Sequence, residues 1–239
     1  SMKPLGLHHW YESGDKRFNP DNILIGSREG NFLAIVDTAT GHIVWHTGPY
    51  YPPTGKDPSA FIHNSKVPRP LDRTSGQHDP NMIAEGLPGA GDILVLDNEG
   101  AAGFPPAIMS IFHGSRILEI NPVTKQIVWQ YTAEDSGRDV WTFDTSLIGS
   151  VRRLPNGNTL IDEGLNGRIF QVSPKGTIVW EYIDPYFAKG FDGGRMIMTN
   201  TVFRAQPVPY DWVPAGTPHS ERAVVPPDLA TYHLPERAE

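Results

Sequence analysis

The sequence contains no cysteine in its 239 residues. That absence excludes disulfide bonds, zinc sites built from thiolates and cysteine nucleophiles. No apolar run approaches the length of about 18 residues that a membrane-spanning helix needs, and the N-terminus lacks a basic region followed by an apolar core. The sequence therefore predicts neither a membrane span nor a retained leader. Ser1 ahead of Met2 resembles the remnant of a cleaved expression tag, so a native leader, or far more, could have preceded it.

Positive charge is also scarce. Lys and Arg together number 20 against 27 Asp and Glu, which gives a formal net charge of −7, and no run of like charges occurs. The densest basic cluster is the pair Arg152–Arg153. A protein that binds a phosphate backbone needs a basic face to release counterions. We therefore expect no nucleic-acid partner, and we expect no membrane partner either.

Glycine and proline are abundant, with 24 Gly and 23 Pro, which argues against a helical bundle. Hydrophobic residues make up 38% of the chain, enough to bury a core. All-β sandwiches and propellers often run about 200–250 residues as one unit. We therefore predict one domain over residues 1–239, with a Pro-rich tail from about residue 207. Two segments, Pro49–Pro70 and Gly100–Gly114, read as long loops.

An internal repeat occurs three times, and each copy reads as three short strands rich in Ile, Val and aromatic residues. The strands are bounded by Gly, Pro, Asn and Asp, which is typical of antiparallel sheets. No helical period of comparable length competes with this pattern. The copies are Asn22–Ile25, Phe32–Asp37 and Ile43–Trp45; Asp92–Val95, Arg116–Ile120 and Ile127–Trp129; and Asn158–Ile161, Arg168–Val172 and Ile178–Trp180.

Each copy ends on a tryptophan, and the spacing of these residues indicates the architecture. Trp45, Trp129 and Trp180 lie 84 and 51 residues apart, so the repeat has the size of a propeller blade, with one long insertion. Blades of about 40–50 residues hold four antiparallel strands. We therefore predict an all-β fold of about three four-stranded β-propeller blades.

The fourth, inner strand of each blade should precede its triplet. We assign it to Asp79–Ile83 in the second blade and to Ser146–Arg153 in the third. The segment Leu7–Pro20 ahead of the first triplet lacks a strand pattern, so the first blade is predicted to lack its inner strand. Thr201–Gln206, by contrast, reads as a strand with no blade of its own to join.

The recurring tryptophans fit an architectural role, because Ile-Val-Trp at the end of a strand fills the space between blades. We therefore expect Trp45, Trp129 and Trp180 to be buried there. An alternative is a quinone-binding propeller, since Ala34–Gly41 followed by Trp45 resembles the blade motif of pyrroloquinoline-quinone dehydrogenases. Those enzymes usually bring a cysteine pair, which this chain lacks, so that resemblance stops at the blade motif.

Polar residues at the starts of inner strands line the channel of a propeller, and His78 stands at such a position. By position alone, a lone histidine there is more often a hydrogen-bonded structural residue than a nucleophile. Asp79 beside it would either orient the imidazole or charge it, and a charged imidazolium would be a poor nucleophile. Thr145 and Ser146 begin the next predicted inner strand and are further channel-facing candidates.

An ordered set of motifs resembles the bacterial arylsulfotransferase family, and the chain is similar to its C-terminal half. Members of that family are six-bladed propellers, so the resemblance implies that the three blades are half of such a propeller. It also implies transfer of a sulfuryl group from an aryl sulfate to a phenol in ping-pong fashion, through a sulfated histidine and without a nucleotide donor. The motifs, within a similarity from about Gly14 to Pro227, are Gln77–His78, Leu94–Gly100, Ser115–Arg116, Arg153–Leu160, Phe203–Ala205 and Pro209–Pro214.

The resemblance maps the nucleophile onto His78, and a neutral imidazole is a competent nucleophile at pH 7. The family's Ser-Arg pair matches Ser27–Arg28, which makes Arg28 the sulfate clamp, because its planar fork suits sulfate oxygens. A solvent-exposed strand end is the plainer interpretation of Arg28. Thr145, Ser146 and Arg116 are the candidate substrate contacts, no metal or cofactor is expected, and the family resemblance implies a periplasmic or secreted location.

Two functions from different classes remain open. The first is an aryl-sulfate sulfotransferase that acts on small phenolic compounds, with His78 as nucleophile. The second is a catalytically lapsed propeller that serves as a binding or assembly module. Transfer of sulfate from 4-nitrophenyl sulfate to phenol, with a sulfated His78 peptide, separates the two.

Three blades cannot close a propeller, which typically needs about four to eight. If Thr201–Gln206 entered another chain as the inner strand of its first blade, two copies would form a six-bladed ring. We therefore expect a homodimer that pairs through propeller edges. A fragment whose first blades are missing is the other explanation of so short a chain, and it is slightly favoured as an account of origin, yet even a fragment should pair through its open edge.

Overall fold

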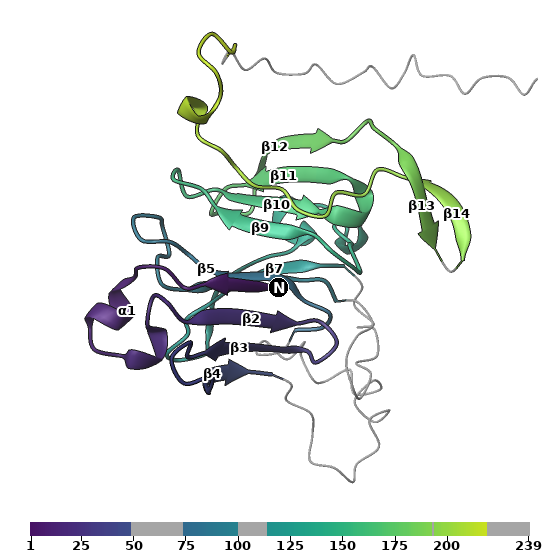
Figure 1. Ribbon diagram of the computed structural model, residues 1–239. Helices are drawn as coiled ribbons and strands as arrows, with labels where there is room; N and C mark the ends of the chain where they lie inside the picture. Colours follow the sequence, from purple (N-terminus) through teal and green to yellow (C-terminus); the bar gives the residue numbers. More distant parts are fainter. Residues whose placement is uncertain (49–73, 100–113, 193, 219–239) are drawn as a thin grey trace, which may run out of the picture. The chain divides into compact units, whose positions relative to one another are not determined.

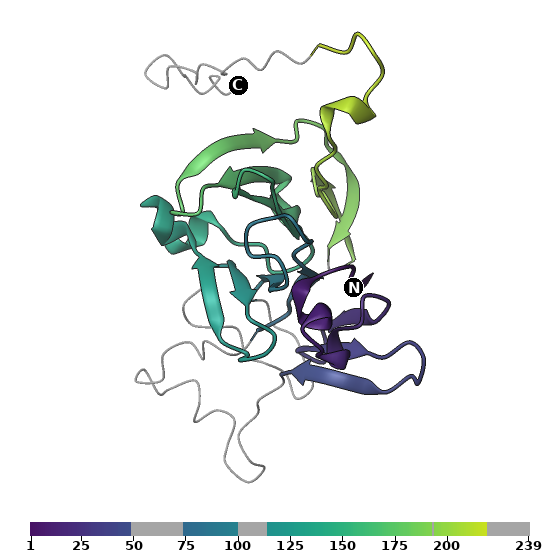
Figure 2. The same cartoon turned by 90° about the vertical axis from the view of Figure 1, so that its left-hand side faces the viewer.

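Three four-stranded antiparallel sheets follow one another along the chain, as Figures 1 and 2 show. The computed structural model describes residues 1–48, 74–99, 114–192 and 194–218, so the two predicted long loops lie outside the described residues, apart from Gly114. Each sheet has the strand order of the sequence, which confirms the prediction of propeller-like blades. The blades are β1 (Met2–Pro4), β2 (Ile23–Ser27), β3 (Phe32–Val36) and β4 (Ile43–Thr47); β5 (His78–Met82), β6 (Ile93–Asp97), β7 (Arg116–Ile120) and β8 (Ile127–Tyr131); and β9 (Ser150–Arg153), β10 (Thr159–Glu163), β11 (Arg168–Val172) and β12 (Ile178–Ile183).

Short helices and one hairpin complete the described part of the chain. The hairpin pairs β13 (Ala188–Asp192) with β14 (Arg195–Thr199) after the third blade. The chain divides into two units, Ser1–Pro207 and Val208–Glu239, and all three blades belong to the first. No helix in the described residues is long and apolar enough to cross a membrane. The helical turns are α1 (His9–Glu12), η1 (Lys16–Phe18), η2 (Ala133–Ser136), η3 (Val140–Thr142), η4 (Gly164–Asn166) and η5 (Tyr210–Trp212).

The first blade does have an inner strand, so the prediction that it lacks one is wrong. β1 runs antiparallel to β2, with Met2 opposite Ile25 and Pro4 opposite Ile23. Three residues that end in proline are too short to show an alternating pattern in the sequence. The amino group of Ser1 extends the pairing by donating to the carbonyl of Gly26 at 3.0 Å.

The leftover segment Thr201–Gln206 forms no strand, contrary to the expectation from its sequence. Its backbone is held in other ways: the amide of Val202 donates to the carbonyl of Gly164 at 2.9 Å, and the amide and carbonyl of Ala205 both bond to the Ser150 hydroxyl. The segment therefore lies against the inner side of its own third blade. These separate bonds, to Gly164 and to the Ser150 side chain, take the place of a backbone ladder.

Each pair of neighbouring blades buries one apolar layer. Leu24 and Leu33 of the first blade pack in one cluster with Ile93 and Val95 of the second. The opposite face of the second blade and the near face of the third share a second cluster, which includes Leu94, Leu96, Ile117, Val151, Ile161 and Phe170. Contact is so close that a side chain on Gly26 would come within 2.6 Å of Pro80.

The recurring tryptophan reaches the turn of the next blade. The indole Nε1 of Trp45 donates to the Pro122 carbonyl at 2.7 Å, and that of Trp129 donates to the Pro174 carbonyl at 3.0 Å. These two bonds confirm the interblade role for Trp45 and Trp129. Trp180 differs: it is 42% exposed and stacks on Tyr182, so the expectation that it is buried is wrong for a single chain, because the third blade has no following turn in the described residues.

Replacing Trp45 by alanine should lower the free energy of unfolding by about 3–5 kcal/mol, because it opens a cavity between two blades and leaves the Pro122 carbonyl without its donor. Trp141 is 66% exposed and serves as the matched control, and Trp141→Ala should change stability by less than about 0.5 kcal/mol. Urea unfolding followed by circular dichroism measures both. Equal stability losses in the two variants would contradict the interblade role.

Candidate active site

His78 opens β5, the inner strand of the second blade, and both of its ring nitrogens have partners. The Nδ1 atom lies 2.8 Å from Oδ1 of Asn98, and the backbone amide of Ile148 donates to Nε2 at 3.3 Å. Because an amide can only donate, Nε2 is the accepting nitrogen and Nδ1 carries the proton to Asn98. The ring is therefore fixed in one tautomer, with the lone pair on Nε2.

Burial keeps this imidazole neutral. It lowers the pKa of His78 below the ordinary value of 6.5, and the positive charge of Arg28 lowers it further. Hydrogen bonds to Asn98 and to the backbone of Gly76 oppose the shift without cancelling it. At pH 7 the side chain is consequently the neutral form that nucleophilic catalysis requires.

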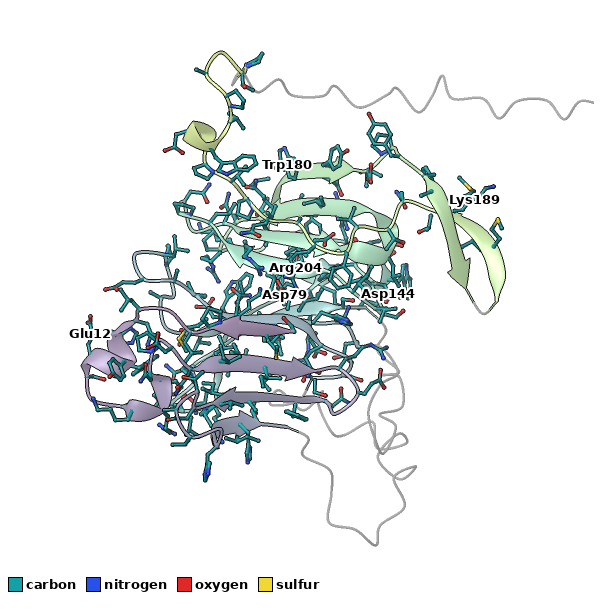
Figure 3. All side chains as sticks on the ribbon, viewed as in Figure 1. Glu12, Asp79, Asp144, Trp180, Lys189 and Arg204 are labelled. Atoms are coloured by element: carbon teal, nitrogen blue, oxygen red, sulfur yellow. The ribbon has the colours of Figure 1, made fainter. Side chains whose placement is uncertain are left out.

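Asp79 does not charge the imidazole, because its carboxylate is committed elsewhere. It forms ion pairs with Lys3 at 2.5 Å, with Arg152, and with Arg204 at 3.6 Å, and Figure 3 shows Arg204 above it. The backbone of Asp79 lies in the left-handed region at φ 56°, within a register shift between His78 and Asn81. This bulge sends neighbouring side chains to different partners. Burial lowers the pKa of Lys3 to about 8 even beside Asp79.

Asn98 is a residue of the site whose role could not be predicted from its sequence position. Its side chain is fully buried, and besides bonding His78 it donates through Nδ2 to the carbonyls of Thr145 at 2.6 Å and Ile148 at 2.8 Å. The side-chain amide of Asn98 thus orients the imidazole of His78 and also holds the turn at Ile148, whose backbone amide donates to Nε2. Ile148 has φ 56°, a strained conformation for a β-branched residue, and such strain is typical of functional sites. The motif Leu94–Gly100 contained Asn98, but only the fold shows its partners.

Arg28 lies beside the same turn. It follows β2 of the first blade, its side chain is one quarter exposed, and it forms an ion pair with Glu29. Its Nη2 approaches the carbonyl of Ser146 at 3.5 Å, two residues before Ile148. The structure therefore brings Arg28, Ser146 and His78 together from three separate parts of the chain.

The other predicted contacts are placed differently. Thr145 and Ser146 precede β9, which begins at Ser150, so the expectation that they start the inner strand is wrong. Thr145 is buried, and its hydroxyl donates to the Leu147 carbonyl at 2.8 Å, which fixes the turn, whereas Ser146 is exposed. Arg116 is buried against Asp97 at 2.8 Å and Glu99 at 3.3 Å, so its charge is balanced within the second blade.

No cluster of three or more metal-binding side chains occurs among the residues that the structure describes. The charged group that acts on His78 is the guanidinium of Arg28, which suits an anion. The arrangement offers a neutral nucleophile on one side and a cation beside it. It can therefore attack an electrophilic centre that carries negatively charged oxygens.

The sequence model of the arylsulfotransferase (ASST) family matches residues 10–184 of the chain. No curated protein matches it. Among solved structures, a protein of unknown function from Bacteroides caccae is similar at 13% identity, over 72% of this chain and 62% of that one, with a TM-score of 0.32. The chain thus spans less than two thirds of that protein's length, and the low TM-score adds no argument about function.

The orienting bond predicts how His78 titrates. Asn98→Asp places a carboxylate against the Nδ1 proton, which favours the charged ring, so the pKa of His78 should rise above its value in the unaltered protein. Histidine NMR titration measures this pKa, and Asn156→Asp, in an exposed turn, is the matched control with no expected shift. An unchanged His78 pKa in Asn98→Asp would show that Asn98 does not bond the ring.

Proposed function

Because the chain belongs to the arylsulfotransferase family, we propose that it transfers a sulfuryl group from an aryl sulfate to a phenolic acceptor, with His78 as the nucleophile. The observation that carries the proposal is the neutral imidazole, whose proton is held on Nδ1 by Asn98 and whose lone pair is on Nε2. The proposal includes the periplasmic or secreted location that the family resemblance implies.

In the first half of the reaction, Nε2 of His78 attacks the sulfur of the aryl sulfate. The bond between sulfur and the aryl oxygen breaks, and the oxygen leaves with its electron pair as a phenolate. The hydrogen bond from the Ile148 amide to Nε2 is long, at 3.3 Å, and it is lost when Nε2 bonds to sulfur. The sulfated ring gains positive charge, which the hydrogen bond from Nδ1 to Asn98 stabilises.

In the second half, the acceptor oxygen attacks the same sulfur. The bond between nitrogen and sulfur breaks, the lone pair returns to Nε2, and the acceptor's proton ends on the released phenolate. Two displacements of this kind form a ping-pong reaction, with the sulfated histidine between them. No nucleotide or other cofactor takes part in either step of this proposed reaction.

Arg28 supplies charge for the sulfuryl oxygens in this proposal. Its guanidinium lies beside the turn that contacts His78, and its field already acts on the ring. Charge on the three oxygens grows as sulfur becomes five-coordinate, so a preorganised cation lowers the barrier. The exposed Ser146 hydroxyl is the proposed further contact, while Thr145 and Arg116 act by holding the surrounding loops.

His78→Ala should abolish transfer from 4-nitrophenyl sulfate to phenol, because no other group forms the covalent intermediate. The exposed His42 is the matched control, and His42→Ala should keep full activity. Release of 4-nitrophenol measures turnover, and mass spectrometry of peptides from enzyme trapped with donor alone should find sulfate on His78. Full activity of His78→Ala would refute the site, and absence of both activity and sulfohistidine in folded protein would favour the binding-module alternative.

Arg28→Ala should slow transfer by about 100- to 1,000-fold, the usual effect of removing one donor to transition-state oxygens. Arg28→Lys keeps the charge but loses the planar fork, so it should recover part of the rate. Measuring kcat and KM separately shows whether the transition state or substrate binding is affected. Arg138→Ala, at an arginine that is 42% exposed, is the control. An Arg28→Ala variant with unchanged kcat/KM would remove Arg28 from the site.

A further inference from the structure

The two interfaces inside the chain follow one rule. The face that a blade turns to its successor, here called its trailing face, ends in a tryptophan that donates to a turn carbonyl of the next blade. The face that receives it, the leading face, presents aliphatic residues. The accepting residue lies two positions beyond the last paired residue of the third strand: Pro122 follows Ile120, and Pro174 follows Val172.

The trailing face of the third blade repeats the donor pattern without an acceptor in the described residues. Trp180 pairs across the sheet with Gln171, just as Trp129 pairs with Glu119 and Trp45 with Ile35. Yet Trp180 is 42% exposed, and Tyr182, stacked on it, is 40% exposed. Figure 3 shows Trp180 on β12, the outermost strand of this blade. In the part of the chain that the structure describes, these two large aromatic rings therefore face no following blade.

The leading face of the first blade repeats the acceptor pattern. Its Ile25 and Val36 are partly exposed, whereas their counterparts Val95 and Ile120 in the second blade are buried. Ile43 is 59% exposed, although its counterpart Ile127 is half-buried against the preceding blade. The first blade thus presents an apolar surface of the kind that elsewhere in the chain receives a tryptophan-bearing face.

We infer that the occupant of each open face is a second copy of this chain. The trailing face of the third blade of one copy packs on the leading face of the first blade of the other. The indole Nε1 of Trp180 then donates to the carbonyl of Thr38, which lies two positions beyond Val36 as Pro122 lies beyond Ile120. The argument rests on continuity with the two interfaces within the chain and does not depend on the proposed reaction.

The blade count selects two copies. Propellers close with about four to eight blades, and the described residues supply three blades in one copy, six in two copies and nine in three copies. Two copies related by a twofold axis give six blades and satisfy all four open faces at once. Head-to-tail contacts of this kind close into a ring only when the rotation per blade suits the number of blades.

The outer half of the trailing face is the part that a second copy would cover. Its inner half is already covered by the segment Thr201–Gln206, which bonds Ser150 through Ala205. Beneath that segment Asp162 is fully buried, and burial raises its pKa to about 7. β1 already completes the first blade, so the contact requires no exchange of strands between copies.

Light scattering coupled to size exclusion tests the proposal on the full chain. The unaltered protein should have twice the chain mass of 26.4 kDa. Trp180→Glu and Ile43→Glu should each yield monomers, because either change puts a carboxylate into the interface from one side. Trp141→Glu, at an exposed tryptophan in η3 between the second and third blades in sequence, should remain a dimer. A stable monomer, a species larger than a dimer, or a dimer that both variants retain would overturn the proposal.

Cross-linking tests the register without disrupting the interface. Because the chain has no cysteine, Trp180→Cys and Thr38→Cys each introduce a single thiol. Mixing these two variants with a short bis-maleimide should give a covalent heterodimer, whereas mixing Thr38→Cys with Trp141→Cys should give none. If the first product formed no more abundantly than the second, the assigned register would be overturned. Sulfate transfer is not needed for either result, so failure of the dimer is distinguishable from failure of the enzyme proposal.

Discussion

The contact between one blade and the next is the interaction on which the rest of the structure depends. A four-stranded sheet has two faces, and the second blade buries both of its faces, one in each apolar cluster. The tryptophan bonds to Pro122 and Pro174 set the distance and angle at the outer rim of these layers. Where the indole reaches a carbonyl, the tryptophan is buried or partly buried between two blades, and where it does not, as at Trp180, a large apolar side chain meets solvent.

The candidate active site is a consequence of this stacking. Arg28 comes from the first blade, His78 and Asn98 come from the second, and Ile148 comes from the turn that enters the third. No single blade contains the nucleophile, its orienting amide and the cation together. Displacing the third blade would therefore break the bond from the Ile148 amide to Nε2 of His78, and displacing the first would move Arg28 away from the turn.

The sequence was most informative where the pattern repeats. Three copies of an alternating strand triplet predicted the blades, and Trp45 and Trp129 have the role that their recurrence indicated. The family motifs predicted His78 as the candidate nucleophile, which the structure places next to Arg28. The blades and the interblade tryptophans were predictable because each is encoded within a few neighbouring residues.

Features that depend on distant partners could not be predicted. β1 is too short to carry a period, and Thr201–Gln206 has the composition of a strand but bonds the Ser150 side chain and Gly164 instead of forming a ladder. Asp79 is adjacent to His78 in sequence yet binds Lys3, Arg152 and Arg204, because the bulge turns it away. The role of Asn98 likewise depends on two carbonyls about fifty residues further along the chain.

The central proposal is that one interblade contact is repeated at every blade face, including the two that the described residues of a single chain leave open. Hydrogen exchange of the indole N–H groups, observed by NMR as a function of protein concentration, tests this most directly. Trp45 and Trp129 should exchange slowly at all concentrations, and Trp180 should approach the rate of Trp129 as the copies associate. Exchange at Trp180 that stays as fast as at the exposed Trp141, at every concentration, would contradict the account.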